Sequence, residues 1–178
     1  IELCGLDPKN HARVGAELAV SRRARAELRA EIEAQFAAFA RTGLAFDHVN
    51  AHRHYHLHPV VGAVLLEVAP RYGVRAVRAP LERDDLLDDL EPGGRSENGR
   101  TVRICAGWLR MRARRAGLLT PDHVFGLRWS GAMGPARLRA LLERLPPGLV
   151  EIYAHPAVSD DFEGAAAQHA PQTRAEVD

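Results

Sequence analysis

Residues 47–59 read DHVNAHRHYHLHP and contain five of the nine histidines in the chain. The segment that starts at Phe46 alternates apolar and polar residues, which predicts a half-buried strand running into a loop. Pro59 is favoured in the first turn of a helix, and the valines and leucines between 60 and 69 supply that helix with an apolar face. This stretch therefore predicts a strand, a histidine-rich segment and a helix in succession.

The same alternation of helix and strand continues on both sides of this stretch. Ser21 and Gly43 flank the first predicted helix as a capping serine and a terminating glycine would. The order predicts an α/β fold with a mainly parallel sheet, open or closed into a barrel, whose functional residues gather at the carboxyl ends of the strands. Helices are expected over 21–42, 59–69, 101–116 and 134–145, and strands over 46–58, 74–78, 124–127 and 149–155.

The remaining segments lack this periodicity. Residues 1–15 and the acidic, glycine-containing stretch 82–100 are expected to be irregular, and Glu82 is expected to be exposed. The tail after Ser159 is polar and is expected to be partly disordered. The chain begins with Ile1 and ends in what resembles the first turn of a helix, so we expect a fragment that lacks part of its active site.

Length and charge exclude several classes of protein. A chain of 178 residues fits a single domain, residues 1–178, and it has no apolar run long enough to span a membrane. The 24 basic and 23 acidic side chains leave a formal charge of +1, which excludes a protein that attracts polyanions by bulk charge. The arginine-rich stretch 110–115 has no interleaved aromatic residues, so we expect no nucleic-acid partner. Two cysteines and no signal peptide indicate a cytoplasmic protein.

Two geometries would bring the clustered histidines together. In a continuous strand, every even position from 48 to 58 lies on one face, and all but one of these positions are histidine. If the strand instead ends near Ala51 and the chain curls into a turn, His52 and His56 meet at a spacing of four residues. Either geometry gathers neutral imidazole nitrogens, which bind Zn²⁺, Ni²⁺, Mn²⁺ or Fe²⁺. The cluster predicts a metal or catalytic site, with adventitious metal binding and a purely structural role as the alternatives.

Two further residues end predicted strands. His155 precedes Pro156, and an imidazole at a strand end is suited to act as a general acid or base. Arg78 would suit binding of an anionic or hydroxyl-rich substrate. For each of these residues, a structural or solvated role is an equally good interpretation of the sequence.

At these residues the sequence resembles the YdjC-like carbohydrate deacetylases. That family has a strand ending in an Asp-Ser-His-His-His-Val-His-type motif followed by proline, which residues 50–56 and Pro59 match. A late family strand ending in His-Pro is matched by residues 151–157. Within the family the chain is most similar to the hopanoid-biosynthesis-associated branch, and the similarity covers most of residues 20–160. The segments that support this branch are 47–50, 72–78, 125–133 and 145–148.

The resemblance implies a distorted (β/α) TIM-like barrel, of which this chain is an incomplete C-terminal portion without the N-terminal strands. It implies one divalent metal ion, which we expect to be Mg, Zn, Mn or Ni. The family's N-terminal Asp, a second metal-binding His and the presumed Asp base have no counterpart here. Asn50 stands where the family commonly has Asp, and Arg53 replaces a His. The expected roles are metal binding for His52 and His56, acid catalysis for His155, and substrate binding for Asn50, His54 and Arg78.

The implied reaction is hydrolysis of the N-acetyl group of an amino sugar, either a small molecule or one carried by a glycosylated hopanoid lipid. Such an enzyme would work in the cytoplasm at the inner face of the membrane, in peripheral contact with it. A homodimer is left open. The alternative function is a non-catalytic metal-binding domain with a histidine-rich loop. We expect the 178-residue chain by itself to have little or no activity, because the base and two metal ligands lie outside it.

Overall fold

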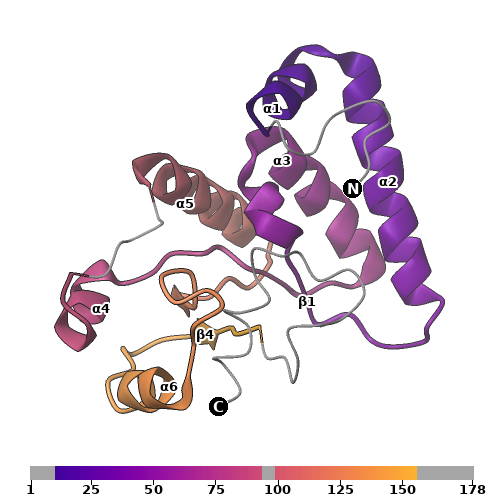
Figure 1. The fold of residues 1–178 in the computed structure, drawn as a ribbon. Helices are drawn as coiled ribbons and strands as arrows, with labels where there is room; N and C mark the ends of the chain where they lie inside the picture. Colours follow the sequence, from indigo (N-terminus) through magenta and orange to yellow (C-terminus); the bar gives the residue numbers. More distant parts are fainter. Residues whose placement is uncertain (1–10, 94–98, 156–178) are drawn as a thin grey trace, which may run out of the picture. The chain divides into compact units, whose positions relative to one another are not determined.

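A computed structural model of the chain describes residues 11–93 and 99–155 (Figure 1). Its contacts divide the chain into two compact units. Unit 1 comprises residues up to 78 together with 105–120, and unit 2 comprises 79–104 together with the residues from 121 onward. Each unit holds one two-stranded parallel sheet with helices, which confirms the α/β class. Within the described residues neither sheet closes into a barrel.

Unit 1 is built on helices whose apolar faces pack inward. The Ser21 hydroxyl caps α2 by accepting the N–H of Ala24 at 3.1 Å, as predicted. The expectation of an irregular segment up to residue 15 was wrong from His11, because the alanines and leucine of HARVGAELAV favour a helix. The helices are α1 (His11–Val20), α2 (Arg22–Ala40), α3 (Pro59–Val68) and the short η2 (Ala69–Tyr72). Helix α5 (Arg100–Arg115) belongs to this unit from Cys105 onward.

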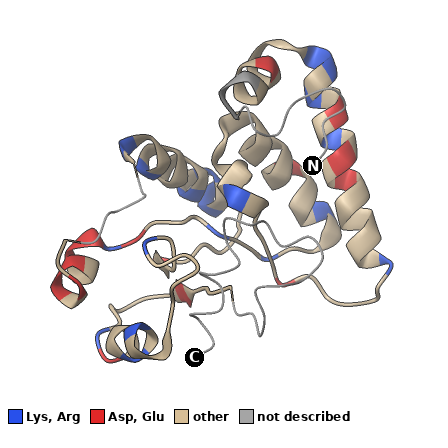
Figure 2. Cartoon of the chain, in the orientation of Figure 1, with Lys and Arg blue, Asp and Glu red and all other residues tan. Residues whose placement is uncertain are grey.

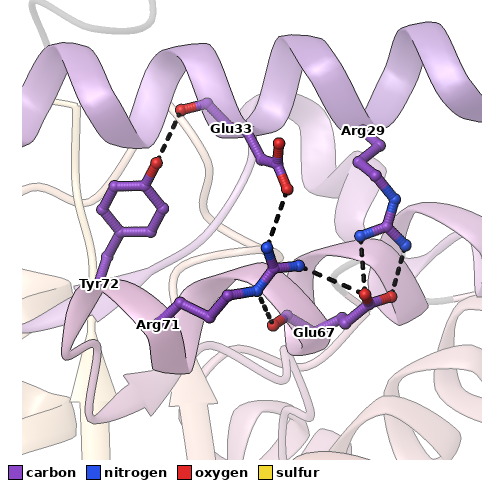
Figure 3. A network of polar contacts seen from close by, with 5 residues as sticks. All are labelled: Arg29, Glu33, Glu67, Arg71 and Tyr72. Atoms are coloured by element: carbon purple, nitrogen blue, oxygen red, sulfur yellow. Dashed lines mark hydrogen bonds and ion pairs between the residues drawn. The ribbon is translucent and has the colours of Figure 1, made fainter.

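A network of polar contacts joins α2 to the α3–η2 segment (Figure 3). Arg29 donates to both carboxylate oxygens of Glu67, at 2.8 and 2.5 Å. Arg71 donates to Glu33 at 3.1 Å and also reaches Glu67, while the Tyr72 hydroxyl donates to the Glu33 carbonyl. These ion pairs are exposed, so each is expected to add only about 0–1 kcal/mol to the stability of the fold.

The sheet of unit 1 is much shorter than predicted. Strand β1 (His48–Val49) pairs in parallel with β2 (Ala76–Val77), and Ala76 also bridges to Leu119. The predicted strand over 46–58 was wrong after Val49, where the chain leaves the sheet and forms the 3₁₀ segment η1 (His52–Leu57). The alternative expectation, a strand that ends near Ala51 and curls into a turn, is the observed geometry.

Unit 2 contains β3 (His123–Phe125) and β4 (Val150–Ile152), which are parallel with His123 opposite Val150. The helix α6 (Pro135–Leu142) lies between them in the sequence. The stretch 82–100 was expected to be a loop, yet residues Asp84–Leu90 form the helix α4. The helix forms because Leu87 is fully buried and two aspartates lie in its first turn, where the helix dipole favours them. The buried core of this unit consists of Leu87, Phe125, Trp129, Met133 and Leu141.

Charge is distributed unevenly over two of the helices (Figure 2). Helix α4 carries four aspartates, and α5 carries six arginines and no acidic residue. Within the described part of the chain, no helix is both long enough and apolar enough to cross a bilayer.

Candidate functional site

The carboxyl ends of β1 and β2 bring two of the predicted site residues together. Because the strands are parallel, both ends lie at the same edge of the sheet. Asn50 directly follows β1, and Arg78 directly follows β2. The backbone N–H of Arg78 donates to the carbonyl of Val49 at 3.1 Å, so the two residues leave the sheet side by side. Asn50 is exposed and Arg78 is half-buried.

His56 joins these two strand ends through its ring. Nδ1 accepts the backbone N–H of Ala51 at 3.1 Å, and Nε2 lies 2.9 Å from the carbonyl oxygen of Arg78. Since Nδ1 accepts, the proton is on Nε2, which donates to that carbonyl. The ring is fully buried, and this burial lowers the pKa of His56 to about 4 despite the opposing hydrogen bond to Arg78. His56 is therefore neutral near pH 7, with both ring nitrogens engaged.

His58 is also engaged on both sides of its ring. Its Nδ1 accepts the N–H of Val60 at 3.3 Å and thereby caps α3. The ring also hydrogen-bonds to the backbone of Gly15 in α1, and burial lowers the pKa of His58. His58 therefore connects two helices, which supports a structural role for it, one of the alternatives for the cluster.

The other three histidines of the cluster differ in exposure. His52 and His48 are exposed, and Nδ1 of His48 lies 3.0 Å from a carboxylate oxygen of Asp47. His54 is half-buried, with its ring centroid 5.8 Å from that of His56. The cluster therefore contains exposed side chains, the half-buried His54 and His58, and the buried His56.

Backbone strain is concentrated in the same segment. Arg53 (φ 49°, ψ 27°) and His54 (φ 56°, ψ 30°) are consecutive non-glycine residues in the left-handed region. Each such residue costs on the order of 1–3 kcal/mol and is kept only where its surroundings impose it. Strain of this kind gathers at functional sites, which marks η1 as a candidate on grounds separate from its histidines.

The described residues do not by themselves form a metal site. Among residues 11–93 and 99–155, no three His, Cys, Asp or Glu side chains are placed so that they could hold an ion. Of the two predicted ligands, His56 would have to give up a hydrogen bond in order to bind a metal, whereas His52 is exposed. Metal binding by either residue stays a prediction.

In unit 2, a buried carboxylate holds the segment that follows β3. Glu82 was expected to be exposed, but it is only 6% exposed. It accepts the backbone N–H groups of Gly126, Leu127 and Arg128 at 2.9, 2.8 and 3.1 Å. Burial raises the pKa of Glu82, and the three N–H donors oppose this shift. No local sequence pattern indicates this burial, because the partners of Glu82 lie more than 40 positions away.

His155 lies three residues beyond the end of β4 and is exposed. Its ring centroid is 5.7 Å from that of Tyr153 in an edge-on arrangement. Gly126 faces the same segment, since a Cβ at that position would lie 2.4 Å from the Tyr153 carbonyl oxygen. His155 belongs to unit 2, and the predicted metal and substrate residues belong to unit 1. Pro156 and the tail after Ser159 lie outside the described residues.

These features define an α/β chain with polar and histidine side chains at the carboxyl edge of parallel strands. The family model for YdjC-like proteins matches residues 6–178, and the chain belongs to that family. It is 32% identical over 148 residues to a carbohydrate deacetylase of Homo sapiens, covering 73% of this chain and 43% of that protein. It is 24% identical over 135 residues to a carbohydrate deacetylase of Thermoanaerobacter pseudethanolicus, covering 76% and 43%. The chain thus spans less than half the length of these curated relatives, and no solved structure is a significant match.

The depressed pKa of His56 predicts a pH-dependent stability. The folded protein keeps this ring neutral down to about pH 4, whereas an unfolded histidine takes up a proton near pH 6.5. The free energy of unfolding should therefore fall by up to about 3 kcal/mol as the pH drops from 6.5 to 4. Urea unfolding at several pH values checks this, with His56→Gln as the comparison. An equally steep fall in His56→Gln would contradict the assignment.

The carboxylate of Glu82 should stabilise unit 2 through its three N–H partners. Glu82→Gln removes the negative charge and replaces one acceptor oxygen by an amide donor that faces the Arg128 N–H, so we expect a loss of about 1–3 kcal/mol in the free energy of unfolding. Hydrogen exchange at residues 126–128 should also become faster. Asp89→Asn, an exposed change on α4, is the control and should leave both quantities nearly unchanged.

Proposed function

We propose that the protein hydrolyses the N-acetyl group of an amino sugar. The observation that carries this proposal is the edge formed by β1 and β2, where Asn50 and Arg78 leave adjacent parallel strands beside the histidines of η1. Membership of the YdjC-like family and the names of the two relatives support a carbohydrate deacetylase. An edge of this kind is where α/β folds bind substrates.

The reaction requires a water oxygen to add to the acetyl carbonyl carbon while one water proton passes to a base, for which the family resemblance implies an Asp outside this chain. The carbonyl oxygen takes up the negative charge, the C–N bond then breaks, and the amine nitrogen leaves with a proton as acetate forms. We propose that His155 supplies that proton, because an imidazole can act as an acid at neutral pH and this residue is exposed beyond β4.

The amide of Asn50, the imidazole of His54 and the guanidinium of Arg78 supply hydrogen-bonding groups suited to sugar hydroxyls. The main chain of Arg78 is held from two directions, by the Val49 carbonyl and by the ring of His56. This anchoring supports Arg78 as a binding residue, because a side chain that starts from a fixed main chain loses less freedom when it binds.

We also propose that His52 contributes one ligand to a single divalent ion, either Mg, Zn, Mn or Ni. Its exposure and the affinity of imidazole for such ions support this role. The remaining ligands would come from groups outside the described residues. The alternative, a storage domain that binds several ions through the whole cluster, is less consistent with His56 and His58, since the rings of both are used within the fold.

The finer features of the family resemblance remain proposals. Each parallel pair, β1 with β2 and β3 with β4, has a helix between its strands in the sequence, which supports part of a (β/α) barrel.

A glycosylated hopanoid substrate would require peripheral contact with the inner face of the membrane. The six arginines of α5, with Ile104 63% and Met111 43% exposed on the same helix, support such contact. A homodimer stays a prediction.

Replacing the proposed acid tests the catalytic assignment. In the full-length protein, His155→Ala should lower kcat for acetate release from an N-acetylated amino sugar by about 10²–10⁴-fold. His48→Ala, another exposed histidine, should have little effect. Equal activity of the wild type and His155→Ala would contradict the assignment.

Metal content tests the role of His52 separately. After dialysis, mass spectrometry of the full-length protein should find about one divalent ion per chain, and His52→Ala should lose it. His48→Ala is again the matched control and should keep the ion. Several ions per chain that persist in His52→Ala would favour the storage alternative.

A further inference from the structure

We propose that His56 is a positioning residue, whose ring holds the loop after β1 against the residue after β2 and so sets how Asn50, His52 and Arg78 are placed. The inference rests on the proposed function insofar as these three residues act on the substrate. It assigns His56 a role different from the predicted one of metal ligand.

Two hydrogen bonds of the His56 ring join the ends of β1 and β2. Backbone pairing joins β1 and β2 over only two residues each. Beyond Val49 and Val77, the fully buried ring of His56 connects the Ala51 N–H to the Arg78 carbonyl. The ring therefore extends the connection between the strands past the point where the ladder stops.

The strained turn at Arg53 and His54 brings His56 to this place. The left-handed Arg53 and His54 turn the chain back, and the His54 N–H donates to the Ala51 carbonyl at 3.0 Å. The main chain of His56 is in turn packed against α3 at Gly62, where a Cβ would lie 2.7 Å from the His56 carbonyl oxygen. A strained turn is kept when its surroundings impose it, and here the ring and the close approach at Gly62 do so.

The imidazole ring differs from the side-chain amides in the hydrogen-bonding groups that it offers on its two sides. An imidazole accepts at Nδ1 and donates at Nε2, on opposite sides of one rigid ring. Asparagine offers an acceptor near the position of Nδ1, and glutamine offers a donor near the position of Nε2. Each substitution is therefore expected to keep one of the two bonds of His56. His58 has the same chemistry and also uses both sides of its ring, but it joins α1 to α3 instead of two strand ends.

Amide hydrogen exchange and kinetics on the full-length protein test the proposal. In His56→Gln, which keeps only the bond to Arg78, exchange of the Ala51 N–H should become about fivefold faster or more. His56→Asn, which keeps the bond to Ala51, should show a smaller change. Both variants should raise KM for the N-acetylated amino sugar more than they lower kcat, because Asn50 and Arg78 bind the substrate. His58→Gln should leave both the Ala51 exchange rate and KM near the wild-type values.

The outcomes separate this proposal from the proposed function. Unchanged Ala51 exchange in His56→Gln would overturn the positioning role, as would loss of the His56 Nε2–H signal when Zn²⁺ is added to the wild type. Faster Ala51 exchange in a protein that deacetylates no sugar would support the role of His56 and contradict the proposed function. If the variants do not fold, the tautomer of His56 in the wild type answers the question, since a dominant Nδ1–H form would overturn the proposal.

Discussion

At the carboxyl end of β1, a single neutral imidazole lies between a backbone N–H and a backbone carbonyl that belong to different strand ends. The ring of His56 is fully buried, so it must stay uncharged for the arrangement to persist. Without it, the Ala51 N–H and the Arg78 carbonyl would each lose a partner, at a cost of about 1–3 kcal/mol if they remained buried. The positions of Asn50 and Arg78 at the sheet edge depend on this contact.

The histidine cluster is thus divided by burial. His56 and His58 lie within the fold, with each ring joining two segments, whereas His52 is exposed on the strained turn between them and the strand. The same residue type is thus buried within the fold at one position and exposed at another. Glu82 follows a similar principle in unit 2, where one buried carboxylate fixes three consecutive N–H groups after β3. In both cases, hydrogen bonds from one buried side chain to the backbone order a segment at the end of a parallel strand.

The sequence pattern predicted those helices whose caps and terminating residues lie nearby in the sequence. The cap at Ser21, the proline that opens α3 and the overlapping ranges of α5 and α6 follow from local preferences. The prediction of a strand over 46–58 was wrong because histidines at alternate positions resemble one face of a sheet. The observed turn depends on two residues with left-handed backbone conformation, which no local sequence pattern indicates. Helix α4 was missed because its aspartates resemble a loop, although the buried Leu87 stabilises it. The residues at the candidate site could be named from the sequence, but their division into connectors and exposed groups required the three-dimensional partners.

The most direct test of this account is nitrogen NMR of the imidazole of His56 near pH 7. A scalar coupling across the hydrogen bond, from the amide nitrogen of Ala51 to Nδ1 of His56, would show that the ring accepts this N–H. We expect that coupling together with a proton on Nε2. Absence of the coupling in the folded protein, with the proton on Nδ1, would contradict it.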